Sequence, residues 1–500
     1  MNPLDYFKEP WIDAVKTPIS KCAADLPSYA CSEPESLVST SRPLSFEIGT
    51  GASIYTQSLL PAILGAEHEV ILVTCFWAPS STLTALRVTL EQLARLRRDH
   101  ILNRPPSHAT RGTLRTLDIH ICFSSRSILQ KLLHPWSRDG YTYPRSDWVS
   151  KLGLPDPKLL DAGLINLQVK SLFFLPFSVM HPKFLIIDRQ RAWLPSCNIS
   201  WESWLEGCVE ITGDAVTTLL KFYHSVWDRH SEINRQLPTT DGLQQQVDYT
   251  LGPGRSGMMP IQSPARHLVA LQLDCIPTIL LPSSHHRNPH FRPLPWQRSR
   301  RPPTTPLNCA ILCLIAMAQE KIYVQTPNLT SVAVIDALLE ALDRGVDVTV
   351  VTSKGMMVLE QILTGGTTTS WCLRSFISQY EKRKKRFMHS AGASNNEDSH
   401  VLDLEAQLPI LGSLEILYFT PLIANQLRHV PEEPVHSHLK LITVDAEYAV
   451  LGSGNMDRAS WFTSQELGIL FQSKEFVANV SDAVNQSLRG RLSPLFHSGR

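Results

Sequence analysis

Two stretches of the chain place the same polar residues around a short apolar run. Residues 181–202 read HPKFLIIDRQRAWLPSCNISWE, and residues 438–460 read HLKLITVDAEYAVLGSGNMDRAS. In both stretches a Lys stands two positions after the His, an Asp five positions after the Lys, and an Asn ten positions after the Asp. A pattern that recurs at fixed offsets indicates a duplicated unit that contributes twice to one site.

The sequence before each stretch predicts the same order of elements. In both halves a helical run precedes a β-rich run, which is followed by an amphipathic run and a second β-rich run. The expected segments are residues 54–66, 69–78, 82–98 and 117–125 in the first half, and 308–319, 321–328, 332–345 and 346–355 in the second. Strands that alternate with helices predict the α/β class, with a largely parallel or mixed sheet in each half. The two α-β-α lobes should form a pseudo-dimer around one shared active site.

Length and composition limit the classes of protein. The 500 residues exceed one ordinary hydrophobic core, which favours two domains. The 47 Lys and Arg residues nearly balance the 46 Asp and Glu residues, which argues against broad, non-specific nucleic-acid binding. The ten cysteines include no C-x-x-C pair, the first residues lack an apolar signal core, and the apolar stretch at 309–318 is shorter than the roughly 20 residues of a membrane span. We therefore expect reduced thiols, no signal peptide or transmembrane helix, and a location in the cytoplasm or at the periphery of an intracellular membrane.

A segment rich in Pro, Arg and His separates the two predicted lobes. The expected domains are an N-terminal extension at 1–44, a first lobe at 45–250, a linker at 251–305 and a second lobe at 306–500. His285, His286 and His290 lie in the linker without accompanying Cys or acidic ligands, so we expect no metal site and no cofactor. The basic run at 381–387 fits a solvated helix face, or a patch that attracts anionic lipid or phosphate.

The repeated residues suggest a specific chemistry. Period-two alternation places His181 with Lys183, and His438 with Lys440, on one face of a strand. Asn198 and Asn455 each follow a turn that can bring a second strand alongside. If the copies face each other, two ammoniums and two amides can stabilise the charge that builds on a phosphate diester. One imidazole can attack phosphorus while the other protonates the leaving oxygen, without a metal ion.

These residues resemble the signature of the phospholipase D superfamily, H-x-K-x(4)-D-x(6)-G-S-x-N, which occurs twice here. The second copy matches fully, whereas the first has Pro195 where the family has Gly, and proline fixes φ at that turn. The matching residues are His181, Lys183, Asp188, Ser196 and Asn198, and His438, Lys440, Asp445, Gly452, Ser453 and Asn455. The resemblance implies lobes at about 45–230 and 306–485 and a phosphohistidine intermediate that is resolved by water or an alcohol.

The resemblance also suggests roles within this site. His181 would be the nucleophile and His438 the general acid, and Glu206 and Glu466 would each orient the His of the opposite copy. For Asp188 and Asp445 two roles stay open: orienting an imidazole, or fixing the end of a strand. The reverse assignment of the two histidines would follow if Pro195 distorts the first copy.

Three function classes fit the sequence. A phospholipid phosphodiesterase or phosphatidyltransferase leads, because the run SLFFLPFSVM at 171–180 could place apolar side chains beside the site. A nuclease of the same superfamily should show a basic groove with stacking aromatics, and a non-catalytic phosphate-binding protein would follow if Pro195 displaces half of the site. The expected partners are therefore a phospholipid substrate and a membrane surface, with nucleic acid less favoured and no obligate protein partner.

Overall fold

The computed structural model describes the chain in several ranges. They are residues 3–16, 33–103, 115–127, 130–131, 139–174, 178–200, 203–229, 261–283, 302–393, 411–423, 427–428 and 432–499. His285, His286 and His290, and most of the expected linker, lie outside the described residues.

The first half of the chain forms a mixed sheet with three parallel strands at its outer side. From that side inward, β5, β3 and β2 run parallel, and β8, β9, β10 and β1 follow in antiparallel pairs. The bounds are β1 Val38–Thr50, β2 Glu69–Phe76, β3 Leu117–Ser125, β5 Ile165–Ser171, β8 Phe184–Ile187, β9 Arg191–Pro195 and β10 Trp204–Thr212. Short strands at the margins are β4 Tyr141–Thr142, β6 Phe173–Phe174, β7 Ser178–Val179 and β11 His267–Ala270.

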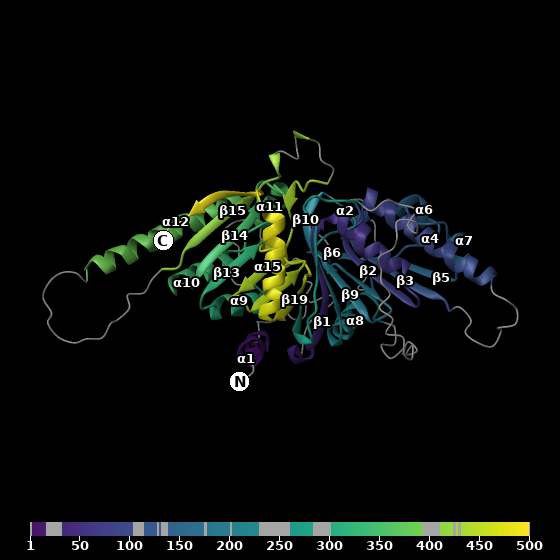
Figure 1. Ribbon diagram of the computed structural model, residues 1–500, viewed down its shortest axis with the longest axis horizontal. Helices are drawn as coiled ribbons and strands as arrows, with labels where there is room; N and C mark the ends of the chain where they lie inside the picture. Colours follow the sequence, from purple (N-terminus) through teal and green to yellow (C-terminus); the bar gives the residue numbers. More distant parts are fainter. Residues whose placement is uncertain are drawn as a thin grey trace.

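The second half repeats this strand order. Parallel strands β15, β14 and β13 are followed by β17, β18, β19 and β12 in antiparallel pairs, and β20 pairs with β15 at the outer edge. The bounds are β12 Ile276–Pro282, β13 Lys321–Gln325, β14 Asp347–Ser353, β15 Leu414–Phe419, β16 His436–Ser437, β17 Leu441–Val444, β18 Tyr448–Gly452, β19 Leu467–Gln472 and β20 Leu492–His497. The predicted α/β pseudo-dimer of two similar lobes is confirmed (Figure 1).

The two sheets meet through their corresponding inner strands. β1 of the first lobe pairs antiparallel with β12, which holds the same place in the second lobe. From the sequence we expected residues 276–282 to belong to the linker, but the structure shows that they form strand β12. Five consecutive residues of β12, from 278 to 282, are buried, so the strand lacks the alternating pattern by which a half-exposed strand is recognised.

Helices cover the faces of both sheets (Figure 1). In the first lobe they are α2 Gly51–Ile54, the π-helical turn η3 Tyr55–Leu59, α3 Leu60–Leu64, α4 Ser81–Leu102, α6 Asp147–Leu152, α7 Pro157–Ala162 and α8 Asp214–Trp227. In the second lobe they are α9 Pro306–Met317, α10 Val332–Asp343, α11 Val358–Gly365, α12 Thr369–Ala393, α14 Arg458–Phe462 and α15 Lys474–Leu488. Coverage on both faces explains why every residue of β8 and of β17 is buried.

The N-terminal helix α1 (Pro3–Lys16) packs on the second lobe, although the sequence places it before the first. Trp11 is fully buried and donates its indole N–H to the carbonyl of Pro306, 3.0 Å away, at the start of α9. The ring of Phe7 lies 5.9 Å from that of Tyr448 on β18. In the described part of the chain, no helix combines the length and the apolar character that a membrane crossing needs.

Candidate active site

The two H-x-K motifs lie where the lobes meet, each tied to the opposite lobe through the backbone. The N–H of His181 donates to the carbonyl of Gln465, 2.9 Å away, and the N–H of His438 donates to that of Leu205, 2.8 Å away. β8 and β17 begin three residues after their respective histidines, so each His and Lys precedes the strand on which the sequence placed it.

Each imidazole contacts a glutamate of the other lobe. His181 Nδ1 lies 2.7 Å from Glu466 Oε2, and His438 Nδ1 lies 2.7 Å from Glu206 Oε1. All four residues are buried or nearly so. Because the carboxylates engage Nδ1, the nitrogen that remains for a substrate is Nε2.

The two serines hold these glutamates in place. Ser196 donates to Glu206 Oε2, and Ser453 donates to Glu466 Oε2 at 2.5 Å. Each serine oxygen in turn accepts the backbone N–H of the residue after its glutamate, at 3.0 Å in both copies. Both orienting carboxylates therefore have fixed positions before any substrate binds.

Pro195 leaves the first copy intact. The matching Gly452 has a φ of 151°, and a Cβ there would lie 2.2 Å from the carbonyl oxygen of Leu467. The first copy uses another backbone conformation, yet Ser196 donates its N–H to the sheet at 2.8 Å much as Ser453 does at 2.9 Å. The distortion considered from the sequence is therefore absent at the serine.

The two lysines are buried beside their histidines, but their ammoniums differ in position. Lys183 Nζ donates to the carbonyl of His181 at 3.0 Å. Lys440 Nζ donates to the carbonyl of His438 at 2.7 Å and also lies 2.7 and 2.9 Å from the two ring nitrogens of that His. The Lys440 ammonium therefore lies against the His438 imidazole, whereas the Lys183 ammonium is hydrogen-bonded to the backbone of His181.

The two asparagines also differ. The Oδ1 of Asn198 accepts the N–H of Cys75 at 3.2 Å, so its Nδ2 is the group that can donate to a substrate. The Nδ2 of Asn455 instead donates to Asp457 Oδ2 at 3.1 Å, and its buried Oδ1 has no partner among the described residues. Asn455 must rotate, or exchange this bond, before its amide can donate to a phosphate.

The two aspartates of the motif do not contact the histidines. The carboxylate of Asp188 accepts backbone N–H bonds from residues 67–69, and that of Asp445 accepts them from residues 319–321, all between 2.7 and 3.0 Å. Asp188 and Asp445 both have positive φ, near 50°, at the turns that end β8 and β17. We predicted that both aspartates are catalytic residues, and the structure corrects this. Each aspartate fixes the end of a strand, and the glutamates contact the imidazoles instead.

Comparison with known proteins agrees with this geometry. A family model described as the phospholipase D-like domain of cardiolipin synthase matches residues 311–488. Over residues 311–488, which contain the second motif, the chain is therefore similar to a phospholipase D-like domain. No curated protein sequence matches it.

Among solved structures, one aligns with a TM-score above 0.5 at low sequence identity, and two others align more weakly. A phosphatidylserine synthase from Haemophilus influenzae Rd KW20 aligns with a TM-score of 0.52 and 15% identity over 92% of this chain and 90% of that one. A polyphosphate kinase from Porphyromonas gingivalis aligns with a TM-score of 0.44 and 11% identity over 96% of this chain and 52% of that one. The phospholipase D family member Nuc from Salmonella typhimurium aligns with a TM-score of 0.26 and 13% identity over 43% of this chain and 96% of that one. The first alignment spans both lobes and supports the fold.

The buried charges of the phospholipase D-like site act across the lobe interface. Burial, and then the ammoniums of Lys440 and Lys183, lower the pKa of His438 well below its usual 6.5. Burial also lowers the pKa of Lys440 to about 7 and raises the pKa of Glu206 to about 7. At neutral pH this half of the site holds a neutral imidazole beside two groups that are each near half-protonation.

The first half holds a neutral imidazole beside an ionised carboxylate. Burial lowers the pKa of His181, and Lys183 and Lys440 lower it further, while Glu466 opposes them. Burial opposes ionisation of Glu466, yet the charge and hydrogen bond of His181 and the ammonium of Lys183 outweigh it and lower the pKa of that carboxyl. Glu466 is therefore a full negative charge at neutral pH, unlike Glu206.

Two residues of the site were missed from the sequence. Asp457 is buried, binds the Asn455 amide and caps α14 by accepting the N–H of Ser460 at 2.9 Å. The ring of Trp204 lies 4.8 Å from that of His438 and covers it. Asp457 had a signal, since it stands two residues after a motif Asn, whereas Trp204 comes from the opposite lobe and had none.

In the apolar run at 171–180, three of the described residues are buried in the core and so cannot form the expected wall for acyl chains. Its residues Leu172, Phe174 and Met180 are buried in the core beneath the site, and residues 175–177 lie outside the described part. The run leads into β8, which is a central strand because it pairs with β2 on one side and β9 on the other. The side chains beside such a strand are covered by the rest of the lobe.

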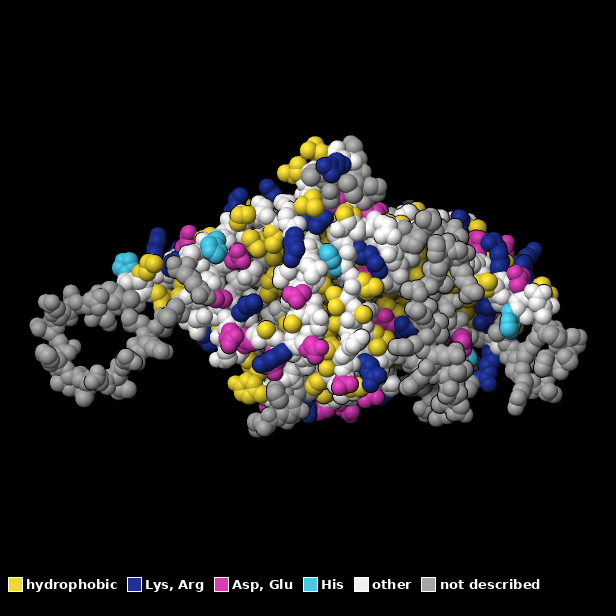
Figure 2. Space-filling view, in the orientation of Figure 1, with side chains coloured by type: hydrophobic (Ala, Val, Ile, Leu, Met, Phe, Trp, Pro, Cys, Tyr) yellow, Lys and Arg dark blue, Asp and Glu magenta, His cyan; other side chains and the backbone are white. Residues whose placement is uncertain are grey.

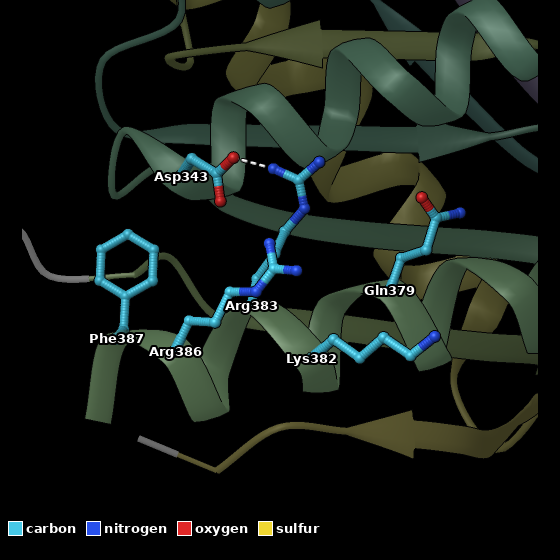
Figure 3. A pocket seen from close by; sticks show the side chains of 6 residues that line it. All are labelled: Asp343, Gln379, Lys382, Arg383, Arg386 and Phe387. Atoms are coloured by element: carbon cyan, nitrogen blue, oxygen red, sulfur yellow. Dashed lines mark hydrogen bonds and ion pairs between the residues drawn. The ribbon is translucent and has the colours of Figure 1, made fainter. Parts of the chain in front are cut away.

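The basic run at 381–387 lies on α12 of the phospholipase D-like chain and borders an open pocket of about 510 Å³ (Figure 3). Its lining residues are Asp343, Gln379, Lys382, Arg383, Arg386 and Phe387. Arg383 pairs with Asp343, and Lys384 donates to the carbonyl of Ser498 at 2.6 Å, so part of the run is tied into the protein. Among the described residues, no three His, Cys, Asp or Glu side chains gather as metal ligands would.

Proposed function

We propose that the chain is a phosphodiesterase of the phospholipase D type that acts on phospholipids, by hydrolysis or by transfer to an alcohol. The observation that carries this proposal is the crossed pairing of the His181 and His438 imidazoles with glutamates of opposite lobes, beside two buried lysines. Such a site has a nucleophile, a general acid and fixed positive charge, which are the parts that a diester displacement needs.

In the first step, Nε2 of His181 attacks phosphorus and the bond to the leaving oxygen breaks. Glu466, ionised and hydrogen-bonded to Nδ1, stabilises the positive charge that develops on His181. The leaving oxygen takes a proton from His438, which leaves a phosphohistidine on His181. The 13% exposure of the His181 side chain, against 2% for His438, favours His181 as the nucleophile.

The neutral His438 must gain its proton before it can act as an acid. Glu206 and Lys440, each with a pKa of about 7, are adjacent proton donors. The negative charge of a bound phosphate favours protonated His438 and draws the Lys440 ammonium away from the ring. In the second step, His438 removes a proton from water or an alcohol, which attacks phosphorus and releases His181.

The choice of a phospholipid rests on two similarities. The matching family model describes the phospholipase D-like domain of cardiolipin synthase, and a solved structure that aligns over both lobes with a TM-score of 0.52 is a phosphatidylserine synthase. Those names belong to the relatives, and the substrate of this chain is inferred from them.

A trapping experiment tests the mechanism. His438→Ala, supplied with a diester that has a good leaving group, should accumulate an acid-labile, base-stable phosphoramidate on His181, and His181→Ala should form none. A label on His438 in His181→Ala would reverse the roles, and no label in either variant, with both folded, would refute the covalent mechanism. Wild-type activity should persist in a chelator, because the lysines already supply positive charge.

The substrate is tested separately with a short-chain phosphatidylcholine below its micellar concentration and with a dinucleotide. Release of the lipid head group, with the dinucleotide left intact, supports the proposal. The opposite preference would assign the site to nucleic acid.

A further inference from the structure

Helix α11 exposes one continuous apolar face in the second lobe. Val358, Leu359, Ile362 and Leu363 recur at helical spacing, and Leu359 and Leu363 are 71% and 51% exposed. A large aliphatic side chain at this exposure gains nothing from the fold of the chain itself. Four such residues on two turns form a patch rather than isolated surface positions.

The opposite side of α11 is fixed to the lobe. Gln361 is buried and donates to Asn328 at 2.7 Å, and its Oε1 accepts the N–H of Thr369 at 2.6 Å, which holds the start of α12. Trp371, two residues later, is 72% exposed. The apolar face is therefore held outward by a buried polar anchor.

A second apolar projection rises beside this helix from the segment between β15 and β16. In the described part of this segment, Ile423 and Leu427 are 72% and 78% exposed. Its base is rigid, because Glu433 accepts two hydrogen bonds from the buried Arg491, each 2.9 Å long, and one from the N–H of Leu422. Figure 2 shows apolar and basic side chains on this projection at the top of the molecule.

Helix α11 and the apolar projection both follow strands that end close to the second histidine. Ser353 ends β14, four residues before α11, and pairs with Phe419, which ends β15 at the foot of the projection. The hydroxyl of Ser353 donates to the carbonyl of Ser437 at 2.7 Å, and the next residue is His438. The exposed apolar residues therefore belong to segments that leave the sheet beside the strand end next to His438.

Cations accompany the apolar side chains. Lys354 precedes α11, Arg374 lies one turn after Trp371 on α12, and Arg428 follows Leu427 in the projection, and all three are exposed. Exposed aliphatic side chains with flanking Lys and Arg match the two components of a bilayer surface, its acyl region and its anionic head groups.

We propose that an apolar rim, defined as Val358, Leu359, Ile362, Leu363, Ile423 and Leu427, inserts into the surface of a bilayer that contains anionic phospholipid. The inference rests on the proposed function for its choice of lipid as the occupant. Insertion at this rim brings the head-group region of the bilayer to the histidines without removing a lipid far from the membrane.

Vesicle binding tests the rim without relying on catalysis. Leu359→Glu/Leu363→Glu should co-sediment with vesicles of phosphatidylcholine and phosphatidylglycerol about tenfold less than wild type or weaker, because two inserted aliphatic side chains become charged. The matched control, Leu96→Glu/Val149→Glu, changes two side chains that are each 53% exposed on the first lobe, and it should bind as wild type does. Wild type should bind vesicles of phosphatidylcholine alone more weakly, and hydrogen exchange should slow over residues 358–371 when anionic vesicles are added.

Parallel assays separate the docking inference from the proposed function. If the double variant melts as wild type does and turns over a monomeric short-chain phospholipid normally, its lost vesicle binding supports the rim. Equal vesicle binding by both proteins, or wild-type dimers that the variant dissociates while no vesicle is bound, would overturn it. Vesicle binding through the rim without turnover of any lipid would refute only the proposed function.

Discussion

The two halves of the site contain the same residue types but hold their charges differently. His181 faces the ionised Glu466 and is partly exposed, whereas His438 is enclosed by Lys440, Glu206 and the ring of Trp204. In the proposed mechanism, the first half attacks phosphorus and the second half supplies the proton to the leaving oxygen. The difference arises from burial and packing, since the His, Lys, Asp, Ser and Asn of the motif are the same in both copies.

The largest effect should come from removing the histidines one at a time. His181→Ala should lose about 10⁴-fold or more of kcat on every diester, because no group remains to attack phosphorus. His438→Ala should lose about 10²- to 10⁴-fold with a poor leaving group and much less in the first step with a good one, because an activated oxygen needs no acid. Measuring kcat for both variants across a series of leaving groups tests these two expectations. Equal losses for both variants across the series would contradict the assignment of nucleophile and general acid.

The next largest effects should come from the two glutamates, whose substitution should affect the two halves of the site differently. Glu466→Gln removes a full negative charge from the nucleophile and should lower kcat about 10²- to 10⁴-fold. Glu206→Gln replaces a carboxyl whose pKa is about 7 by a neutral group of the same shape, so its loss near pH 7 should be about tenfold or less and should flatten the pH profile around that value. Profiles of kcat against pH decide this, and a larger loss in Glu206→Gln would reverse the comparison.

A third measurement concerns stability, because Lys440 is buried with a pKa of about 7, against 10.5 for an ordinary lysine. Between these values the unfolded chain binds more protons at this position than the folded chain, so the contribution of Lys440 to stability is complete above pH 10.5 and is lost as pH falls towards 7. Lys440→Met should remove a slope on the order of 1 kcal/mol per pH unit from the free energy of unfolding in this window. Urea titrations at several pH values test it, and an unchanged slope in the variant would show that the lysine is not responsible.

The smallest effect should come from Pro195, the position at which the two motifs differ. Pro195→Gly restores the family residue, but the serine hydrogen bonds already match in both copies. We expect kcat to stay within about twofold of wild type and the free energy of unfolding to fall by about 1 kcal/mol, because glycine gives the unfolded chain more freedom. Activity and urea unfolding measure the two quantities, and a large gain in kcat would show that proline does distort the first half.

Much of the fold followed from the sequence alone. Apolar periodicity predicted β2, β3, β13 and β14 and the helices around them, because these segments are long and their patterns are strong. It did not predict β12, in which five adjacent buried residues show no alternation, or the packing of α1 on the second lobe. Those contacts join segments far apart in the sequence and leave no local signal.

The same division holds for the site. The sequence determined that two His, two Lys and two Asn recur at fixed offsets, because residue type and spacing are local properties. The family resemblance also led us to expect that Glu206 and Glu466 contact the histidines of the opposite copies. Only the tertiary structure decided that the aspartates tie down strand ends and that Lys440 contacts the His438 ring. These facts depend on which lobe faces which and on how deeply each charge is buried, and both are set by the packing of the whole chain.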